Sequence, residues 1–368
     1  MSKVLIVFNH PAPYKVKLFN ELAKYIDLTV IFERDKASDR NKSFYEEKQY
    51  TFSNVKIKGL KLGRENILSN GVKKHIKQND YDLIIMNGYS QFAEMKAIDY
   101  LIKQKIPYTL YINGGIVKQK ESSLKRKLKT KYISHAANYL SPDENSNLYL
   151  VFYGADKSLI YNYPYSTIYQ NEILNENVPE KSKLELREKA NIKEEKVFVS
   201  CGQLIKRKNY FELIKKWKDI NSNYGLYIIG DGKQKGFLEK YIKENSINNV
   251  HLLGYMKRKD IFDFYHLSDA FVFPSDEDIY GHVINEAMSQ GLPVISTPNV
   301  NASKKLVKND YNGYIISSVE NDELVEAINK VIKNKLSENA LKTARENTIE
   351  KMVEEHLKIL KRIMKKWM

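Results

Sequence analysis

Short apolar runs alternate with amphipathic stretches along the chain and predict a repeated strand–helix order. Strands are expected where apolar runs are bounded by turn residues, at 4–8, 28–32, 82–86, 107–112 and 138–140. Helices are expected where apolar residues recur three and four positions apart, at 13–25, 72–78 and 93–103. The mostly charged stretch 34–49 has neither period and predicts a loop. This alternation is typical of a doubly wound parallel α/β sheet, whose ligands bind at the carboxyl ends of the strands.

The periodicity is lost between residues 161 and 183, where turn residues such as Pro164 and Pro179 replace it. We therefore place a domain boundary there, with a first domain of residues 1–165 and a second of residues 166–349. Beyond the boundary the alternation restarts, with strands expected at 197–200, 226–229, 250–253, 270–273, 294–296 and 313–316. The two halves predict two Rossmann-like units in tandem, with an active site in the cleft between them.

The length and composition of the chain are consistent with two domains. The chain has 368 residues, of which 42% are apolar, enough for two globular domains. No stretch approaches the roughly 20 apolar residues of a membrane span, and the apolar run at 4–8 is too short for a signal peptide. The single cysteine, Cys201, lies in an apolar run and predicts a buried residue without a disulfide. We therefore expect a cytoplasmic protein.

The net charge of +15 favours polyanionic partners: nucleic acid, an anionic lipid surface or a phosphorylated substrate. Over much of the chain lysines stand beside acids, and that pattern fits a soluble surface equally well. Two segments carry few acids, from Lys118 to Lys131 and from Lys358 to Met368. Both suit an anionic bilayer, and we expect the first to dock on one. No motif of interleaved aromatic and basic residues is present, so nucleic acid is not an expected partner.

A basic turn follows the strand expected at 197–200. Gly202 permits a tight turn and close backbone approach at the strand end. Lys206, Arg207 and Lys208 then place three cations before the next helix, a natural grip for a diphosphate. An ordinary solvated basic loop fits the same residues equally well.

Two further glycine turns follow the next two strands. Gly230 begins a Gly-Asp-Gly turn, and Gly254 precedes Tyr255 and Met256. These turns share one edge of the sheet with the basic turn, where a backbone loop beside an aromatic ring suits a nucleobase. Each is also the composition of an ordinary turn between a strand and a helix.

Two carboxylates, Asp278 and Glu286, flank a helix start near Gly281. A helix start has free N–H groups and a partial positive charge, which suit a phosphate, so the acids can bracket whatever that phosphate carries. Asp278 is also a common helix-capping residue, and Glu286 fits a surface position. However, Val283 and Ile284 indicate a buried helix, and a buried glutamate needs hydrogen-bond donors such as those of a ribose diol.

In order and spacing, these motifs resemble the carboxy-terminal half of family 4 glycosyltransferases. The shared pattern covers residues 195–318 and includes Pro-Ser, then Asp-x-Tyr-Gly-x-x-x-x-Glu-Ala-Met-x-x-Gly-x-Pro-Val-Ile. Residues 9–14 and 113–115 match more loosely and look like the bacterial branch that builds capsular and exopolysaccharide units. The resemblance implies the α/β GT-B fold, two Rossmann-like domains facing a central cleft, with a final helix at 350–368 completing the first domain. It also implies a retaining hexosyltransferase that uses a nucleotide-diphosphate sugar, by family habit a UDP-sugar, and no cofactor.

The resemblance assigns roles residue by residue. Glu286 takes the ribose hydroxyls, and Asp278, or Glu277 beside it, lies next to the donor sugar. The positions that usually clamp the diphosphate fall on Gln203 and Lys208; Gln203 lacks charge, so Arg207 or Lys206 compensates. The candidate donor site also includes Gly202, Gly230, Tyr255, Met256, Tyr280, Gly281, His282 and Val283. The acceptor side is expected at His10, Tyr14, Asn113, Gly114 and Gly115.

The expected chemistry is stabilisation of a departing diphosphate. Lys208, Arg207 and the backbone N–H groups at 281–283 would stabilise its charge, with Asp278 beside the sugar. No cluster of metal ligands stands out in the sequence, so we expect metal independence. In a retaining reaction the diphosphate itself takes the acceptor's proton, while His10 orients or deprotonates the acceptor; a loop histidine without a role fits equally well. The acceptor is expected to be a lipid-linked glycan at the inner face of the plasma membrane.

The sequence is also compatible with two other function classes. A nucleotide-sugar epimerase or a sugar phosphorylase also uses the GT-B fold, although phosphorylases often carry a lysine-bound cofactor and a longer chain. Product formation without an acceptor would identify an epimerase. A polyanion-binding protein without enzymatic activity is suggested by the charge alone, and a steep salt dependence of duplex binding would identify it.

Overall fold

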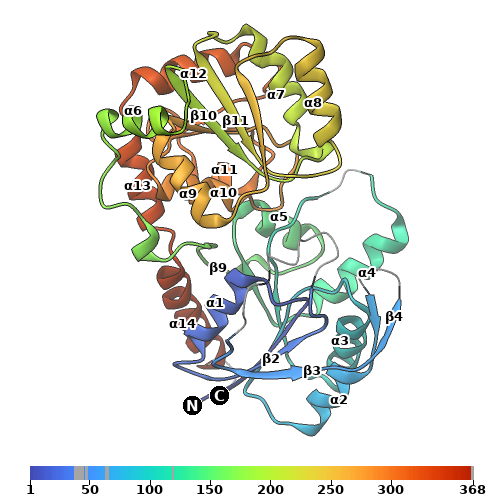
Figure 1. Ribbon diagram of the computed structural model, residues 1–368. Coiled ribbons are helices and arrows are strands. Elements are labelled where there is room, and N and C mark those ends of the chain that lie inside the picture. The colour runs from blue at the N-terminus through green and yellow to red at the C-terminus, as the bar shows by residue number, and fades with distance from the viewer. Residues whose placement is uncertain (37–44, 46–48, 63–65, 118–119, 366–368) are drawn as a thin grey trace. The chain divides into compact units, whose positions relative to one another are not determined.

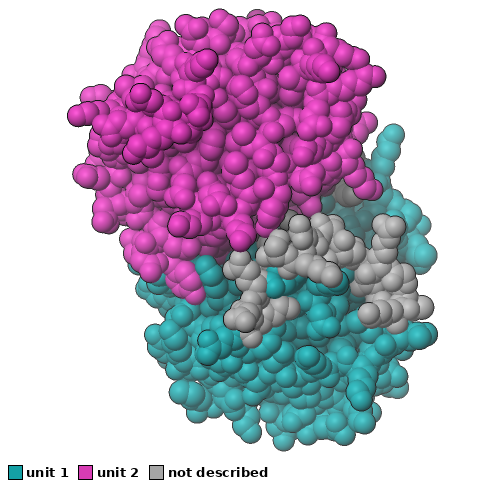
Figure 2. Space-filling view, viewed as in Figure 1, with its two compact units in different colours: residues 1–165, 349–368 teal, residues 166–348 magenta. Residues whose placement is uncertain are grey.

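The computed structural model describes the chain except for residues 37–44, 46–48, 63–65, 118–119 and 366–368. Most of the loop expected at 34–49, the first two residues of the basic segment at 118–131 and the end of the last helix therefore lie outside the described residues. The chain divides into two compact units (Figure 2). Unit 1 is Met1–Tyr165 with Ile349–Met368, and unit 2 is Ser166–Thr348.

Unit 1 is built on a parallel seven-stranded sheet in the order β3-β2-β1-β6-β7-β8-β9 (Figure 1). Its strands are β1 (Lys3–Phe8), β2 (Asp27–Phe32), β3 (Ser53–Lys56), β6 (Leu83–Met86), β7 (Thr109–Tyr111), β8 (Asn138–Ser141) and β9 (Ile160–Asn162). A small antiparallel pair, β4 (Leu60–Leu62) and β5 (Asn66–Leu68), is separate from this sheet. The helices are α1 (Pro13–Leu22), α2 (Gly71–Gln78), α3 (Phe92–Gln104), α4 (Ser123–Ser134), α5 (Glu144–Phe152) and α14 (Ile349–Lys365).

Strand β1 shows why its residues are apolar throughout. Leu5 and Val7 belong to the core under α2 and α3, whereas Phe8 packs against Phe19 of α1 with ring centroids 5.6 Å apart. Both faces of the strand are therefore buried, as is usual in parallel sheets. Helix α14 packs beside α1, so the end of the chain returns to the first unit (Figure 1).

Unit 2 is a parallel six-stranded sheet in the order β12-β11-β10-β13-β14-β15. The strands are β10 (Lys196–Cys201), β11 (Tyr224–Ile229), β12 (Val250–Gly254), β13 (Ala270–Phe273), β14 (Val294–Ser296) and β15 (Gly313–Ile315). The helices are α6 (Glu180–Lys189), α7 (Tyr210–Lys216), α8 (Lys235–Glu244), α9 (Arg258–Leu267), α10 (Val283–Ser289), α11 (Asn301–Leu306), α12 (Glu323–Lys333) and α13 (Ser337–Arg345).

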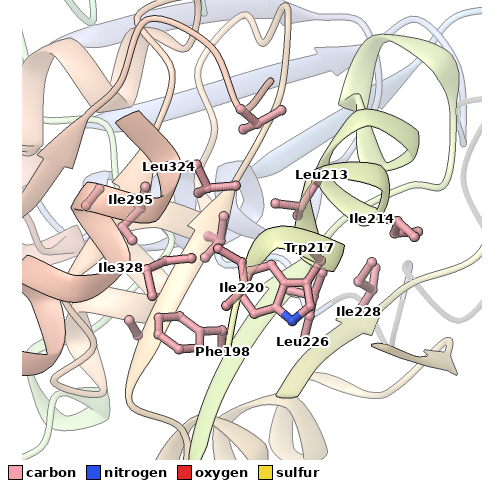
Figure 3. Close-up of a cluster of buried hydrophobic side chains, with 14 of the residues drawn as sticks. Phe198, Leu213, Ile214, Trp217, Ile220, Leu226, Ile228, Ile295, Leu324 and Ile328 are labelled. Atoms are coloured by element: carbon pink, nitrogen blue, oxygen red, sulfur yellow. The ribbon is translucent and has the colours of Figure 1, made fainter. Parts of the chain in front are cut away.

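One face of this sheet holds the main core of unit 2. Trp217 is fully buried there against Phe198, at a centroid distance of 5.4 Å (Figure 3). Its indole N–H donates to the Tyr224 carbonyl at 3.2 Å. Leu324 and Ile328 of α12 close the same cluster (Figure 3). Burying such a tryptophan with its one polar atom satisfied fixes α7 and α12 over the sheet.

The strand orders locate a topological switch point in each unit. In unit 2 the chain moves outward from β10 to β12 and then returns to start β13 on the other side of β10. In unit 1 the same reversal occurs between β1 and β6. Loops leaving the two strands at a switch point diverge, and the space between them is where open α/β sheets bind ligands.

Candidate functional site

In unit 2, the loops that leave β10 and β13 are tied together at the switch point. The turn η4 (Lys206–Lys208) follows β10, and the Arg207 carbonyl accepts hydrogen bonds from Asp276 N at 2.9 Å and Ser275 Oγ at 3.2 Å. The Arg207 guanidinium donates to the Glu277 carbonyl at 2.9 Å. These bonds fix the basic turn against the acidic loop.

Lys208 and Asp278 form an ion pair across these two loops. The Lys208 side chain is only 7% exposed and its Nζ lies 4.5 Å from the centre of the Phe273 ring, whereas Lys206 and Arg207 are exposed. A lysine in such surroundings needs a partner for its charge. The two side chains predicted for the diphosphate and for the sugar therefore neutralise one another.

Three glycines bring the ends of β10, β11 and β12 into close contact. Gly202 N donates to Ile229 O at 3.0 Å, and Gly230 N donates to Gly254 O at 2.7 Å. A Cβ added to Gly230 would lie 1.9 Å from the Gly202 carbonyl oxygen, and its φ of +151° also favours glycine. The glycine turns thus have a structural reason, and beside them Tyr255 is 53% exposed.

The start of α10 is shaped by Gly281. Its φ is +95°, and an added Cβ would lie 2.6 Å from Val300 Cγ1. The Asp278 carboxylate accepts from Tyr280 N at 3.2 Å and closes the turn before α10, whereas the N-cap residue of the helix is His282. Helix α10 spans only seven residues, so its dipole is short.

Glu286 lies on α10 with its carboxylate held from one side. Its Oε1 accepts hydrogen bonds from Arg258 Nη1 at 2.8 Å and from Thr167 Oγ1 at 2.9 Å, and its side chain is 18% exposed. Arg258 also lies 3.3 Å from a carboxylate oxygen of Glu172. Burial and the nearby negative charge of Glu286 raise the pKa of Cys201 to about 12, so this thiol stays protonated.

Arg258 and Thr167 were not among the residues predicted from the sequence. Arg258 opens α9 between Lys257 and Lys259, so its neighbours gave it no distinction. Thr167 lies in the turn-rich stretch that was read as a domain boundary. The one available signal was position, since Arg258 follows the third glycine turn at the same edge of the sheet.

The predicted site residues fall on the two units in two sets. Unit 2 brings to its carboxyl edge the donor-side residues Gly202, Gln203, Lys206, Arg207, Lys208, Gly230, Tyr255, Met256, Glu277, Asp278, Tyr280, Gly281, His282, Val283 and Glu286. Unit 1 carries the acceptor-side residues at the ends of β1 and β7, namely His10, Tyr14, Asn113, Gly114 and Gly115.

The acceptor-side residues have partners within unit 1. His10 Nδ1 is 3.1 Å from the Tyr45 hydroxyl, and the Tyr14 ring packs edge-on against Tyr165. Tyr165 donates to Asn113 Oδ1 at 3.2 Å, and Asn113 donates to Asn87 Oδ1 at 3.0 Å.

Gly115 leaves no room for a side chain. An added Cβ would lie 2.5 Å from the Tyr149 ring, and Gly115 N donates to Ser146 Oγ at 3.1 Å. Gly114 beside it has a φ of +145°. The Asn113-Gly114-Gly115 turn is therefore set by local packing.

Comparison with known proteins identifies the second unit. Residues 182–350 match the family model described as glycosyl transferases group 1. These residues form a group 1 glycosyltransferase domain. The match confirms the resemblance to glycosyltransferases at the level of group 1.

None of the helices in the described part of the chain combines the length and the apolar character that a membrane span requires.

Curated relatives match over part of their length. An uncharacterized glycosyltransferase of Methanocaldococcus jannaschii is 37% identical over 133 residues, which is 32% of each chain. A UDP-Gal:alpha-D-GlcNAc-diphosphoundecaprenol alpha-1,3-galactosyltransferase of Escherichia coli is 33% identical over 148 residues, covering 38% of this chain and 37% of that protein. The first matches span between 32% and 49% of the relatives' own length.

A solved structure is similar over almost the whole chain. Anabaena Alr3699/HepE, in complex with UDP, has a TM-score of 0.79 at 19% identity, over 98% of this chain and 100% of that chain. At this identity the likeness concerns the fold, and it confirms the predicted GT-B fold with two Rossmann-like domains.

Proposed function

We propose that the protein is a retaining glycosyltransferase that moves a hexose from a UDP-sugar to a lipid-linked or cell-surface glycan, without a metal ion. The observation that carries the proposal is the pairing of Lys208 with Asp278 and of Arg258 with Glu286 at the switch point of a group 1 domain. Support for the donor comes from the UDP complex of a structural neighbour, and for the acceptor from a relative named for a diphosphoundecaprenol-linked sugar.

Each donor-site residue then has one task. Glu286 accepts hydrogen bonds from ribose hydroxyls, and Tyr255 and Met256 border the base. Lys208, with Arg207 and Lys206 on the exposed side of the same turn, meets the diphosphate. Because Lys208 already pairs with Asp278, the diphosphate competes with Asp278 for the amine. Asp278 is thereby released toward the sugar, and Glu277 beside it is the alternative contact.

The reaction breaks the bond between the anomeric carbon and the diphosphate oxygen, and the electron pair leaves with that oxygen. Lys208 and Arg207 stabilise the charge that develops there, which is the largest electrostatic demand of the step. The acceptor hydroxyl attacks the face the diphosphate leaves, and its proton passes to the departing phosphate oxygen. His10 orients the acceptor. Cationic side chains take the part that a divalent cation plays in other transferases, so we expect full activity in a chelator.

A panel of ligands tests this proposal. UDP is expected to raise the unfolding temperature more than GDP, ADP or CMP, and Glu286→Ala is expected to remove that shift. Transfer from UDP-hexoses to a polyprenyl-diphosphate sugar should persist in EDTA and keep the anomeric configuration. Absence of stabilisation by every nucleoside diphosphate, together with full transfer by Glu286→Ala, would refute the proposal. Turnover without any acceptor would instead identify an epimerase.

We further propose that unit 1 docks on anionic lipid through the α4–α5 surface, defined here by Leu124, Lys125, Lys127, Leu128 and Phe152. Leu124 is 77% exposed, Leu128 41% and Phe152 43%. Lys129 and Lys131 are held by Glu121 and Asp99, whereas Lys125 and Lys127 make no ion pair within the described residues. Exposed apolar side chains between unpaired lysines match an anionic bilayer surface, where each lysine contributes about 1 kcal/mol.

Vesicle sedimentation tests this surface. We expect binding to vesicles that contain phosphatidylglycerol but not to pure phosphatidylcholine. Leu124→Asn should weaken it roughly tenfold, since burying a leucine contributes about 1.5 kcal/mol or more. Leu184→Asn is the matched control, because Leu184 is 54% exposed on α6 of unit 2. Equal loss in both variants would refute the proposal.

A further inference from the structure

The two oxygens of the Glu286 carboxylate have different surroundings. Oε1 accepts from both Arg258 Nη1 and Thr167 Oγ1, at 2.8 and 2.9 Å. Oε2 makes no hydrogen bond to any residue that the structure describes, and the side chain keeps 18% of its surface exposed. The protein thus occupies Oε1 with two hydrogen bonds, whereas Oε2 can still accept hydrogen bonds from a ligand.

Arg258 is itself fixed from several sides. Its Nη2 donates to the Thr167 carbonyl at 3.3 Å and lies 3.3 Å from Glu172 Oε1, and its guanidinium stacks 4.8 Å from the centre of the Phe262 ring. Glu172 in turn accepts from Tyr169 N at 2.7 Å. A guanidinium held in this way presents Nη1 in a single direction, because its donors form a rigid planar fork.

The charges of this cluster leave a net negative site. Glu172 and Glu286 contribute two negative charges and Arg258 one positive charge, so Glu286 is oriented without being fully neutralised. A carboxylate that is fixed before a ligand arrives loses less rotational freedom on binding than a mobile one.

We propose that Arg258 and Thr167 are positioning residues that turn Glu286 so that Oε2 receives the ribose hydroxyls of the donor, which makes the site selective for ribonucleotides over deoxyribonucleotides. This inference rests on the proposed function, because it requires a nucleoside diphosphate at this edge of unit 2. In this proposal both residues act through their hydrogen bonds to Glu286.

The test compares the dissociation constants of UDP and 2′,3′-dideoxy-UDP, measured by calorimetry on the full-length protein. The wild type should bind UDP roughly ten- to a hundredfold more tightly than 2′,3′-dideoxy-UDP, the size expected of hydrogen bonds to a charged acceptor. The ratio of the two dissociation constants measures this preference. Thr167→Val removes one hydroxyl at almost constant volume and should reduce this ratio several-fold, whereas Thr167→Ser should retain it. Arg258→Gln should reduce the ratio toward one.

The ratio of the two dissociation constants distinguishes a loss of Glu286 orientation from a general loss of positive charge. Loss of a nearby positive charge weakens UDP and its dideoxy analogue alike and leaves their ratio unchanged, and Lys259→Gln, an exposed neighbour on α9, is the control for that effect. Arg258 joins several segments, so Thr167→Val keeps the test valid if Arg258→Gln does not fold.

Two outcomes overturn different statements. If the wild type binds UDP with a clear ribose preference and both Arg258→Gln and Thr167→Val keep that preference, the positioning role is wrong while the proposed function stands. If the wild type binds no nucleoside diphosphate, the proposed function itself fails.

Discussion

Ionisable side chains are buried or partly buried at the carboxyl edges of both sheets, but their pairing differs between the two units. In unit 2 the partly buried groups form opposite pairs, Lys208 with Asp278 and Arg258 with Glu286. In unit 1, Glu33 after β2 and Glu94 at the start of α3 lie together as like charges, and Lys15 has no carboxylate partner among the described residues.

The acid pair of unit 1 retains a proton. Glu94 N donates to Glu33 Oε1 at 3.2 Å, and Glu33 Oε2 and Glu94 Oε1 are buried without hydrogen bonds to described residues. Burial raises the pKa of Glu33 to about 8; burial, and then the charge of Glu33, raise the pKa of Glu94 as well. Two carboxylates this close cannot both ionise without large cost.

Burial disfavours the charged form of the Lys15 amine. Its amine donates to the Tyr111 hydroxyl at 2.6 Å and lies 4.3 Å from the ring centres of both Tyr111 and Tyr165. Burial lowers its pKa well below the usual value. The two edges therefore differ in how they accommodate ionisable groups: unit 2 pairs opposite charges, whereas in unit 1 burial disfavours the charged forms of Lys15, Glu33 and Glu94.

Removing a charge from unit 2 should have the largest effect. Lys208→Met keeps the side chain's length and apolar stem but removes the cation that we propose faces the leaving diphosphate. We expect kcat of transfer to fall by roughly 10²–10³, the usual loss for one electrostatic stabiliser of a developing oxyanion. Lys243→Met, an exposed lysine on α8 with no proposed role, is the control and should leave kcat near the wild-type value.

A double substitution separates catalysis from folding in this pair. Lys208→Met leaves Asp278 unpaired, so part of the damage is structural. Adding Asp278→Asn should restore thermal stability without restoring kcat. Recovery of both quantities would mean that the pair only maintains the fold.

Removing a charge from unit 1 should instead stabilise it at alkaline pH. A carboxyl whose pKa is raised by folding binds more protons in the native state, so its contribution to stability falls as pH rises from about 4.5 to about 8. Glu94→Gln keeps an oxygen acceptor for Ser90 N and Gln91 N but cannot ionise. We expect urea unfolding to show a gain on the order of 1–3 kcal/mol at the top of this window and none at its bottom. A pH-independent change, or one shared by exposed Asp80→Asn, would contradict this account.

The fold was predictable because parallel strands are buried on both faces, so their sequences are continuous apolar runs. The predicted runs at 4–8 and 28–32 match β1 and β2 closely. Strand β9 was missed because Ile160–Asn162 adjoins the turn-rich stretch and has only three residues. Helix α5 was missed because its first half is polar and its apolar residues do not keep to one face.

The site was predictable where one segment carries several of its residues. Glu286 and Asp278 share a loop and a helix, and Lys208 lies in a conspicuous basic turn. Arg258 and Thr167 reach Glu286 from 28 and 119 residues away, and nothing in the local sequence encodes such contacts. The Glu33–Glu94 pair, 61 residues apart, is likewise a product of tertiary burial.

His356 extends the contrast to acid pH. Its Nδ1 donates to the Met352 carbonyl at 2.7 Å, and burial lowers its pKa to about 3. A histidine whose pKa is lowered by folding binds fewer protons in the native state, so stability falls as pH drops from about 6.5 toward 3. His356→Phe keeps an aromatic ring against Tyr163 and should stabilise unit 1 by about 1–2 kcal/mol near pH ~5, measured by urea unfolding. Exposed His135→Gln should show no such gain, and an equal gain there would assign the effect to surface charge.

The smallest effect is expected from Lys15→Met, which repeats in unit 1 the substitution proposed for Lys208. Met has similar length, fits among the rings of Tyr111 and Tyr165, and replaces the amine's contacts with favourable sulfur–aromatic ones. It loses one hydrogen bond to the Tyr111 hydroxyl, but it also removes the cost of burying an amine, so at neutral pH we expect a change in unfolding free energy of less than about 1 kcal/mol. The native state of the wild type binds fewer protons at Lys15 than the unfolded state, so its stability should rise as the pH approaches 10.5, and the variant should lack that rise. Donor binding and kcat should stay at wild-type values, because Lys15 has no carboxylate partner among the described residues whereas Lys208 pairs with Asp278. A loss of kcat in Lys15→Met as large as that in Lys208→Met would show that the amine of unit 1 takes part in the chemistry and would remove the distinction between the two edges.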